Sequence, residues 1–513
     1  MKSKANIWIC VVGVLSVIAF IFFNLEWFPG LHGDEAWVGL YASRVKANGL
    51  YTPHLMNTYT GAMFGWMVHR SFETFGTSIF GLRFLSAFCN SLAAIGFVVW
   101  SWRRFGSRGA VVMTGLLASS MLFLFYGRLA WEVCAFEHLL ILAILWSCRP
   151  FVEEGRFPVS RLLVFFGAIE FGILNHFIFL SIPLSLAVYA AAGGALLKDW
   201  RAARLRPLFF LSVLLAVVCY CKSFVTPTVF VEYRVWFLAV LFLLPFAFTA
   251  FFRWGHERFP RLDFLDGLWA RRILLTVIVL GSISFCIWHL APMIQIYSGV
   301  ALFRRVVSFN PLWPVRWVLY AWGAGLLGMF FVRLAEIVRT PSVASEGSYA
   351  RFILLWTASY LAVFILMRHT SSIRYYIVMH ALTLAAIAIS ATRTRFLWRP
   401  RNAAIAAVFV LGLHSFGWVE ASTMPARQPS KFRVGFRLEK SIDFIDKREL
   451  FARTDSDGVC EWDHSKQDFL YIPAIFHRNG HPVTCDRSKM LALDYCWDCK
   501  TPPFYSYSLV AKE

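Results

Sequence analysis

Residues 5–27 read ANIWICVVGVLSVIAFIFFNLEW, an apolar run long enough to cross a bilayer as one helix. A membrane has a hydrocarbon core about 30 Å thick and needs about 20 apolar residues per helix. Similar runs, bounded by charges or by Pro, Gly and Asn clusters, recur outward along the chain and predict an all-α polytopic membrane protein of about thirteen spans. The predicted spans are residues 5–27, 79–101, 109–127, 131–148, 161–175, 177–197, 207–224, 235–252, 273–291, 314–332, 352–367, 375–391 and 403–420.

The composition of the whole chain agrees with this fold class. Of 513 residues, 58% are hydrophobic and 16% are charged, and the mean hydropathy of +0.59 lies outside the range of soluble domains. The net charge is +20, but residues 421–513 hold 14 Lys and Arg against 13 Asp and Glu, so the excess belongs to the membrane part. We therefore expect membrane lipid, and no nucleic acid, as a partner of the basic residues.

The distribution of Lys and Arg predicts the orientation of the chain. With the N-terminus in the cytoplasm, the N-terminal lysines and the inner loops hold 24 Lys and Arg, whereas the outer segments before residue 421 hold 11. The positive-inside rule favours this orientation, and an odd number of spans then places the C-terminus outside. The sequence thus predicts a transmembrane catalytic module at residues 1–420 and an extracytoplasmic domain at residues 421–513.

The predicted inner loops leave no room for a nucleotide-binding domain. None of them exceeds about 20 residues, and the chain contains no G-x-x-x-x-G-K-[ST] motif. This excludes the usual ATP-driven pumps and transferases with a cytoplasmic domain for nucleotide sugars.

Four of the eleven cysteines lie in the predicted outer tail, where an oxidising compartment favours disulfides. These disulfide candidates, whose pairing the sequence does not choose, are Cys460, Cys485, Cys496 and Cys499. The spacing from Cys496 to Cys499 also fits half of a zinc or redox motif, but a zinc ribbon needs two such pairs. Strand-like runs around an Asn-Gly turn in residues 468–485 predict a small mixed α/β domain.

The first outer loop, residues 29–78, holds the strongest candidate for chemistry. HGDEAW at residues 32–37 opens a stretch predicted to form a helix on the membrane surface, with Asp34 near its N-cap. A helix N-terminus keeps a carboxylate ionised, as a base requires. The alternative is that Asp34 is only a cap and Glu35 only a first-turn acid. The apolar face of this helix is predicted to be Trp37, Leu40, Tyr41 and Val45.

Several short motifs follow the first span: GDEA at residues 33–36, Gly49, Pro53, FG at 75–76 and LRFLS at 82–86. Later motifs are Arg128 with Glu132, Asn175-His176 at a span junction, and Arg374-Tyr375-Tyr376 before the twelfth span. Together they resemble the C-type (GT-C fold) integral-membrane glycosyltransferases, in particular the bacterial relatives of protein O-mannosyltransferases and of the lipid A aminoarabinose transferase. The predicted topology agrees with this family over nearly the whole chain.

This resemblance implies glycosyl transfer at the extracytoplasmic face of a bacterial inner membrane. It implies a polyprenyl-phosphate-linked sugar as donor, a glycan, lipid or protein as acceptor, and Asp34 as the base of an inverting displacement. Because the leaving polyprenyl phosphate is already a stable anion, one carboxylate and a cationic clamp suffice. We expect no required cofactor, although an Asp-Glu pair is also able to hold a divalent metal.

Side chains at the outer ends of spans are the substrate-binding candidates, because the lipid phosphate must lie there. Arg128 either binds the phosphate, oriented by Glu132, or only pairs with Glu132 within a helix. His176 either donates a hydrogen bond or only breaks a helix, and Arg83 needs an acid or the donor phosphate as its partner. The candidates are Glu35, Arg83, Arg128, Glu132, His176, Arg374 (competing with Arg304, Arg305 and Arg368 for the phosphate) and Tyr375, with no metal ligands.

Two other classes of function stay open. A transporter or lipid flippase predicts ionisable residues near mid-membrane in related halves of the chain, whereas the carboxylate pair here lies in the first outer loop. A non-catalytic scaffold would leave that pair without a task. For Glu137 and Glu170, deep in predicted spans, we expect internal hydrogen bonds rather than catalysis.

Overall fold

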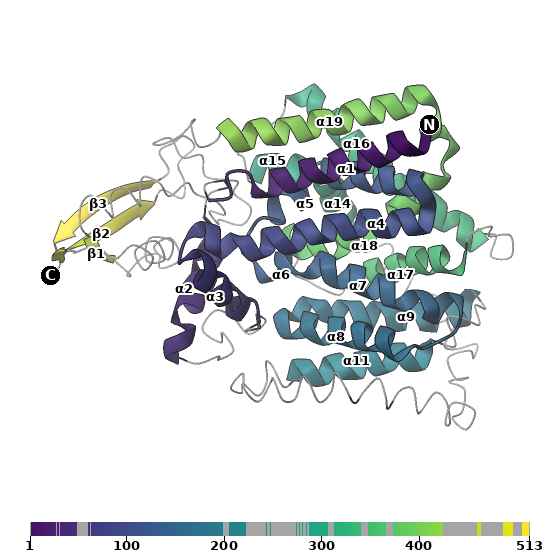
Figure 1. Cartoon of the computed structure of the whole chain (residues 1–513), viewed down its shortest axis with the longest axis horizontal. Helices are drawn as coiled ribbons and strands as arrows, with labels where there is room; N and C mark the ends of the chain where they lie inside the picture. The colour runs from purple at the N-terminus through teal and green to yellow at the C-terminus, as the bar shows by residue number, and fades with distance from the viewer. Residues whose placement is uncertain are drawn as a thin grey trace.

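The chain folds into a bundle of helices that run along one common direction (Figure 1). The computed structural model describes residues 2–48, 60–197, 205–221, 287–305, 312–339, 347–365, 373–423, 459–462, 486–495 and 505–511, except residues 27, 30 and 62, together with six isolated positions between 243 and 284. The helices are α1 (Lys2–Phe22), α2 (Gly33–Asn48), α3 (Met63–Phe75), α4 (Ile79–Ser119), α5 (Met121–Tyr126), α6 (Glu132–Ala135), α7 (Glu137–Glu153), α8 (Val159–Asn175), η1 (Phe177–Leu180), α9 (Ser181–Leu197), α11 (Arg206–Tyr220), α14 (Leu290–Tyr297), α15 (Val300–Arg305), α16 (Trp313–Arg339), α17 (Ser348–Ile365), η4 (Ile373–Tyr375), α18 (Tyr376–Arg393), η5 (Arg395–Trp398) and α19 (Pro400–Thr423).

Among the described residues, five helices are long and apolar enough to cross a membrane. They comprise Ala5–Phe22 of α1, α4, Trp313–Ile337 of α16, α18 and α19. Large apolar side chains cover the outside of this bundle, and Trp8 on α1 and Val408 on α19 are 67% and 71% exposed. Water does not stabilise so large an apolar surface, whereas lipid solvates it. The apolar helices and their apolar exterior identify an integral membrane protein, as the sequence predicts.

Helix α4 consists of two antiparallel halves that meet at Gly106. This glycine has φ 70° and ψ −167°, a conformation that residues with a side chain rarely adopt. After Gly106 the chain runs beside α1 in the same direction, since Asn6 donates to Ser107 and the ring of Phe20 contacts that of Phe125. The two halves correspond to the predicted spans at residues 79–101 and 109–127.

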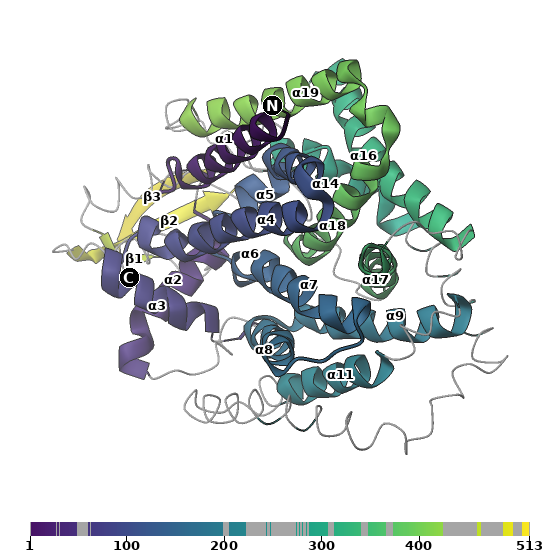
Figure 2. The same cartoon turned by 45° about the vertical axis from the view of Figure 1, so that its right-hand side comes forward.

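Helix α18 forms the centre of the bundle (Figure 2). Every residue from Tyr376 to Ala391 is buried, and the helix packs against α4, α7, α16 and α17. A helix apolar on all sides is stable only when surrounded by other helices or lipid. The position of η4, immediately before α18, is therefore fixed by the core.

The predicted spans agree with the described helices at most places. The break between residues 161–175 and 177–197 is confirmed, because His176 is extended (φ −156°, ψ 135°) between α8 and η1. The span predicted at residues 131–148 begins too early, since Trp131 is extended and α7 starts at Glu137. Residues 235–252 and 273–291 lie mainly outside the described residues, so the count of thirteen stays a prediction.

The surface predicted to be the apolar face of α2 is not its most buried one. Trp37 and Tyr41 are only half-buried, whereas Ala36, Val38 and Ala42 are buried. Small residues let α2 and α3 approach closely, and a Cβ on Gly65 of α3 would lie 2.4 Å from the Tyr41 ring. The half-buried Tyr41 ring thus packs on α3, while Ala36, Val38 and Ala42 form the fully buried part of α2.

Three strands are described in the C-terminal region: β1 (Val459–Trp462), β2 (Asp486–Tyr495) and β3 (Tyr505–Ala511). β1 pairs with β2 in parallel, and β2 pairs with β3 antiparallel, with Leu491 opposite Leu509. The predicted turn region 468–485 and three of the four tail cysteines (Cys485, Cys496 and Cys499) lie outside the described residues, as does the side chain of Cys460. The mixed α/β domain, its boundary at residue 421 and its disulfides stay predictions.

Candidate active site

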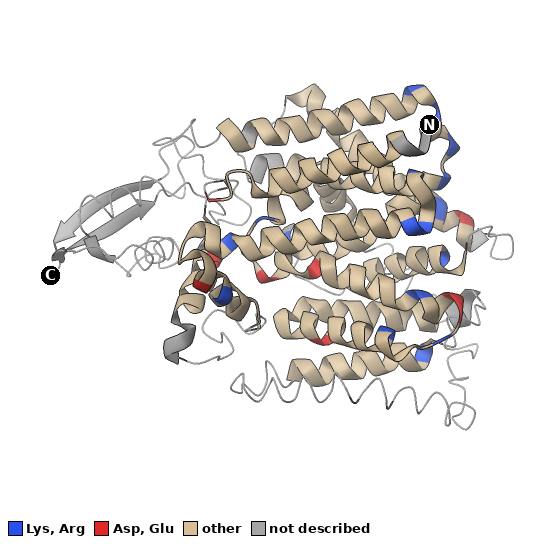
Figure 3. Ribbon diagram, in the orientation of Figure 1, with Lys and Arg blue, Asp and Glu red and all other residues tan. Residues whose placement is uncertain are grey.

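The two ends of the bundle differ in charge (Figure 3). Most described Lys and Arg residues lie at the end that holds the N-terminus of α1, whereas several acids lie at the other end, near α2 and α6. The sequence-predicted site residues gather at this second end. They come from four places: the start of α2, residues 128–132, the junction of α8 with η1, and η4.

His32 caps helix α2. Its Nδ1 accepts the backbone N–H of Asp34 at 3.0 Å, and its own backbone N–H donates to Glu35 Oε2 at 3.1 Å. This reciprocal arrangement is a capping box, which satisfies two backbone donors at the helix start. Asp34 is therefore not the cap; its side chain, 28% exposed, points elsewhere.

The Asp34 carboxylate pairs with Arg374. This arginine belongs to η4 and lies two residues before the first residue of the core helix α18. Arg374 Nη1 donates to Asp34 Oδ2, and His32 Nδ1 lies 3.7 Å from the same oxygen. Burial raises the pKa of Asp34, but His32 and the Arg374 guanidinium outweigh it, so the pKa lies below its ordinary value. Arg374 is charged at every physiological pH. The site thus holds an ionised, partly accessible carboxylate.

Two aromatic rings position Arg374. Its guanidinium carbon lies 5.3 Å from the ring centroids of both Trp131 and Tyr375. Trp131 in turn meets the His32 ring edge to face at 4.8 Å. The guanidinium is 19% exposed, so it is able to contact a ligand from the same side as Asp34.

Glu35, the neighbour of Asp34, is part of a different structure. Its two oxygens accept from Arg83 Nε at 2.9 Å and Nη2 at 2.8 Å, from the N–H of Ala130 at 2.8 Å and from the N–H of His32. Arg83 also donates to the carbonyls of Leu25 and Pro29, and both charged side chains are fully buried. A carboxylate has about four acceptor positions. Since Glu35 fills them all within the protein, the pair holds the first loop to the bundle rather than binding substrate.

Arg128 does not pair with Glu132. It is fully buried, and its guanidinium donates to the carbonyls of Phe20 and Phe23 at the end of α1. The helix spacing predicted for these residues is absent, because residues 127–131 form a turn between α5 and α6. Arg128 therefore satisfies helix-end carbonyls, and the phosphate role predicted for it has no support in this geometry.

Glu132 belongs to a second polar group, buried beside the Asp34–Arg374 pair. Its Oε1 accepts from the Thr60 hydroxyl at 3.1 Å and lies 3.8 Å from His176 Nε2. His176 Nδ1 accepts the N–H of Ile178, so in the neutral ring Nε2 carries the proton and faces Glu132. The backbones of Thr60 and His176 also form a bridge. This group brings the first loop against the α8–η1 junction.

Sequence reasoning missed three residues of the site: His32, Thr60 and Trp131. His32 belongs to the HGDEAW motif, and Glu35, three residues after it, is the half of a capping box that the sequence shows. Nothing in the sequence marks Thr60 or Trp131, because both act through contacts with distant segments. Of the arginines that compete with Arg374 for a phosphate, Arg368 lies outside the described residues, and so do the side chains of Arg304 and Arg305.

The described residues around Asp34 do not fit a metal ion. In the described part of the chain, no three or more His, Cys, Asp or Glu are placed to hold one. The first candidate ligand, Asp34, already pairs with Arg374, whose positive charge repels a cation. The carboxylate–guanidinium pair is instead suited to a proton and an anion.

Comparisons with known proteins give structural neighbours only. No protein-family model matches the sequence, and no curated protein does. The Archaeoglobus fulgidus oligosaccharyltransferase, solved with zinc and sulfate, is 15% identical with a TM-score of 0.49 over 90% of this chain, which spans 57% of that chain. ArnT from Cupriavidus metallidurans, bound to undecaprenyl phosphate, is 14% identical with a TM-score of 0.38 over 96% of this chain and 93% of that one. Both TM-scores are below 0.5, so neither neighbour assigns a function to this chain.

Proposed function

We propose that the protein is an integral-membrane glycosyltransferase that moves a sugar from a polyprenyl-phosphate donor to an acceptor hydroxyl. The observation that carries the proposal is the Asp34–Arg374 pair, a carboxylate and a guanidinium that meet, both partly exposed, where α2 and the core helix α18 begin. The carboxylate can take a proton and the guanidinium can bind a phosphate. These are the two functions that transfer from a lipid phosphate requires.

Donor binding and base activation are coupled in this arrangement. The donor phosphate competes with Asp34 for Arg374, because both are anions that seek the same guanidinium. When Arg374 turns its donors to the phosphate, the pKa of Asp34 rises from its lowered position toward the ordinary range. Asp34 thus becomes a stronger base once the donor is in place.

The transfer step then needs no further acid. Asp34 takes the proton of the acceptor hydroxyl while the acceptor oxygen attacks the anomeric carbon. The bond from that carbon to the phosphate oxygen breaks, and its electron pair remains on the phosphate, where Arg374 stabilises the charge. Attack from the side opposite the phosphate inverts the anomeric centre.

The second polar group supplies contacts for the sugar or the acceptor. Glu132 is a hydrogen-bond acceptor that already orients the Thr60 hydroxyl, and His176 presents a ring N–H toward it. Hydroxyl-rich ligands need such paired donors and acceptors. Trp131 and Tyr375 add aromatic faces beside Arg374.

The charge difference between the two ends of the bundle supports the orientation (Figure 3). We place the arginine-rich end in the cytoplasm, following the positive-inside rule, and the Asp34 end on the extracytoplasmic side of a bacterial inner membrane. The acceptor is then a glycan, lipid or protein on that side. The C-terminal domain shares this compartment, where its four cysteines are able to form disulfides.

A second candidate function, a lipid or solute transporter, is favoured by one observation. Glu137 and Glu170 are fully buried on α7 and α8, and their carboxylates find no hydrogen-bond partner among the described residues. Buried acids of this kind are common along ion pathways in membranes. The internal hydrogen bonds expected for these two acids are therefore not found.

The two candidates separate in one experiment. Purified protein in vesicles is incubated with a panel of polyprenyl-phosphate sugars, and product formation is compared with movement of labelled donor across the bilayer. The transferase predicts a glycosylated product that the Asp34→Asn variant does not form. Movement across the bilayer without product, equal in wild type and variant, would favour the transporter instead.

A further inference from the structure

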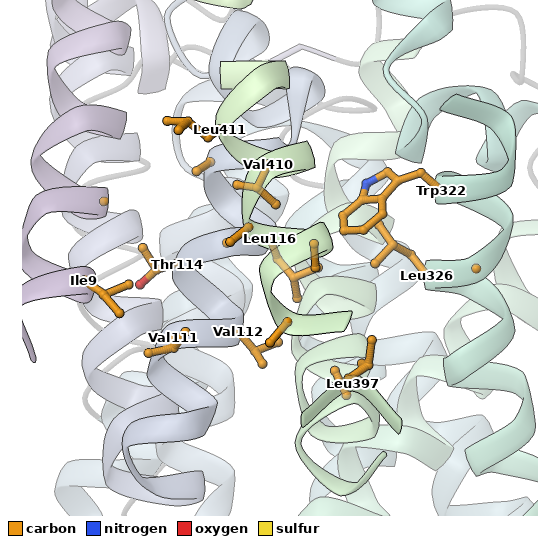
Figure 4. Close-up of a pocket in the computed structure, with 18 of the residues that line it drawn as sticks. Ile9, Val111, Val112, Thr114, Leu116, Trp322, Leu326, Leu397, Val410 and Leu411 are labelled. Atoms are coloured by element: carbon orange, nitrogen blue, oxygen red, sulfur yellow. The ribbon is translucent and has the colours of Figure 1, made fainter. Parts of the chain in front are cut away.

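A cavity lies away from the Asp34 site, between α1, α4, α16, η5 and α19 (Figure 4). Its volume is about 630 Å³, within the range of about 300 to 1,000 Å³ typical of ligand sites. Among the side chains that line it are Ile9, Leu116, Trp322, Leu326 and Val410. None of the candidate active-site residues contributes to it.

The cavity belongs to the opposite end of the bundle from Asp34. It reaches Ala391 and Thr394 at the end of α18, whereas Arg374 precedes the start of that helix. Since 18 helical residues rise about 27 Å, the cavity and the Asp34 site face different leaflets of a bilayer. A donor whose phosphate binds Arg374 therefore has its headgroup in the other leaflet.

Empty space of this size needs an occupant. Gly115 on α4 and Gly325 on α16 both line the cavity, and a Cβ added to either would meet no atom within 4 Å. Protein interiors contain few voids larger than a water molecule. The wall residues Val12, Phe396 and Leu411 are each about 60% exposed, so the cavity opens sideways, where lipid lies. An apolar cavity that opens to lipid is filled by a hydrocarbon chain.

The rim of the cavity at η5 is basic. Trp398 lines the cavity, and the guanidinium of Arg108 lies 5.1 Å from its ring centroid. Four further exposed arginines, Arg393, Arg395, Arg399 and Arg401, each lie within two residues of a lining residue in the sequence. Neither Arg108, also exposed, nor any of these four forms an ion pair within the described part of the chain.

Trp322 Nε1 and Trp398 Nε1 are both buried and have no acceptor among the described residues, and protein atoms enclose both, so neither faces the cavity. The headgroup preference therefore comes from the arginines, which favour an anionic headgroup over a zwitterionic one.

We propose that this cavity binds an anionic glycerophospholipid of the leaflet opposite the Asp34 site. One acyl chain occupies the space between α1, α16 and α19, and the phosphate lies against the η5 arginines. The polyprenyl donor is not the occupant, because its phosphate belongs at Arg374. The lipid fills a gap between helices that no described side chain closes, and so holds the outer helices α1 and α19 to the core.

Native mass spectrometry of the delipidated full-length chain tests this proposal. The protein is titrated with phosphatidylglycerol and with phosphatidylcholine of the same acyl chains. We expect tight retention of phosphatidylglycerol only. Gly115→Leu and Gly325→Leu, which fill the cavity from two sides, should each reduce retention at least about tenfold, because the chain loses its space.

Gly328→Leu is the matched control. It lies one turn from Gly325 on α16, also has no atom within 4 Å of an added Cβ, and does not line the cavity. It should leave retention unchanged. The double variant Arg395→Gln/Arg399→Gln should weaken phosphatidylglycerol binding about 30-fold, equivalent to about 2 kcal/mol or 1 kcal/mol per arginine, and so reduce the preference for phosphatidylglycerol over phosphatidylcholine.

Two results would overturn the proposal. Equal retention of both lipids would show that the headgroup is not recognised, and equal effects of Gly325→Leu and Gly328→Leu would show that the cavity is not the site. Thermal unfolding of each variant accompanies the titration, so that a loss of fold is not read as a loss of binding. Since the readout is lipid retention, failure here leaves the glycosyltransferase proposal untouched.

Discussion

Asp34 and Glu35 are neighbours in the sequence, and each pairs with an arginine, yet the two pairs differ in every other respect. Glu35 and Arg83 are fully buried, and Glu35 has all its acceptor positions filled by the protein. Asp34 and Arg374 are partly exposed and retain room for other partners. The difference shows that one dipeptide can contribute one carboxylate to architecture and the other to chemistry, because successive helix residues face about 100° apart.

Of the effects expected from breaking the two pairs, the largest is the loss of activity when Asp34 is replaced. Asp34→Asn removes the proposed base without changing its volume, and general bases contribute about 10²- to 10⁴-fold to rate. We expect at least a hundredfold loss of turnover with normal thermal stability, measured with a polyprenyl-phosphate sugar at saturation. Glu73→Gln, which removes a partly exposed acid on α3, is the control and should keep full activity. Turnover by Asp34→Asn at the wild-type rate would show that Asp34 is not the base.

The next effect is on stability. Glu35→Gln leaves Arg83 buried without its counter-ion, which costs about 3 to 5 kcal/mol of the free energy of unfolding. The sequence-based assignment of Glu35 to substrate binding predicts instead a stable protein with weaker substrate binding. Denaturation in detergent distinguishes the two. The double variant Glu35→Leu/Arg83→Met should recover part of the stability, because no charge is left unpaired although the backbone groups that the pair satisfied lose their partners.

Arg374→Gln should act on donor binding. Losing a charged hydrogen bond to phosphate costs about 1.5 to 3 kcal/mol, or roughly a 10- to 150-fold rise in the donor KM. Arg374→Lys should recover part of the loss, since it keeps the charge and loses the planar fork. Arg70→Gln, an exposed arginine on α3, serves as control. An unchanged donor KM in Arg374→Gln would remove this residue from the phosphate site.

The pH profile gives a smaller and more specific effect. Asp34 must be ionised to act, so activity is lost as pH falls through its pKa, which in the free enzyme lies below the ordinary value near 3.8. Arg374→Gln removes the main permanent charge that lowers this pKa. The acid limb of kcat/KM should therefore move to higher pH in the variant. An acid limb at the same pH in wild type and variant would show that Arg374 does not lower the pKa of Asp34.

Chelation should have the smallest effect. Arg374 supplies positive charge beside Asp34, and the described carboxylates are not arranged around a cation. Activity should therefore persist in EDTA. Loss of activity, restored by one divalent ion, would mean that the donor phosphate is held by a metal.

The sequence predicted those features that depend on local pattern. Apolar runs predicted the helices, and the polar pair Asn175-His176 predicted the break between α8 and η1. Motifs at the ends of spans predict both Asp34 and Arg374 as site residues. They do not predict that the two side chains pair directly. What the sequence did not predict depends on contacts between distant segments.

Arg128 and Glu35 illustrate this limit. The spacing of Arg128 and Glu132 predicts a pair only if a helix joins them, and a turn joins them instead. Glu35 meets Arg83 across 48 residues, and Thr60 meets Glu132 across 72. No periodicity reports such contacts, because the packing of α2 and the first loop against the bundle decides which side chains remain free.

The affinity of Asp34→Asn for the donor tests the central claim most directly, because the claim is that Asp34 and the donor phosphate compete for Arg374. Binding of a labelled polyprenyl-phosphate sugar to wild type and variant is measured at equilibrium without acceptor. Removing the competing carboxylate should tighten donor binding about fivefold, the equivalent of about 1 kcal/mol for a partly exposed ion pair, while transfer is lost. Weaker donor binding by Asp34→Asn than by wild type would contradict the account.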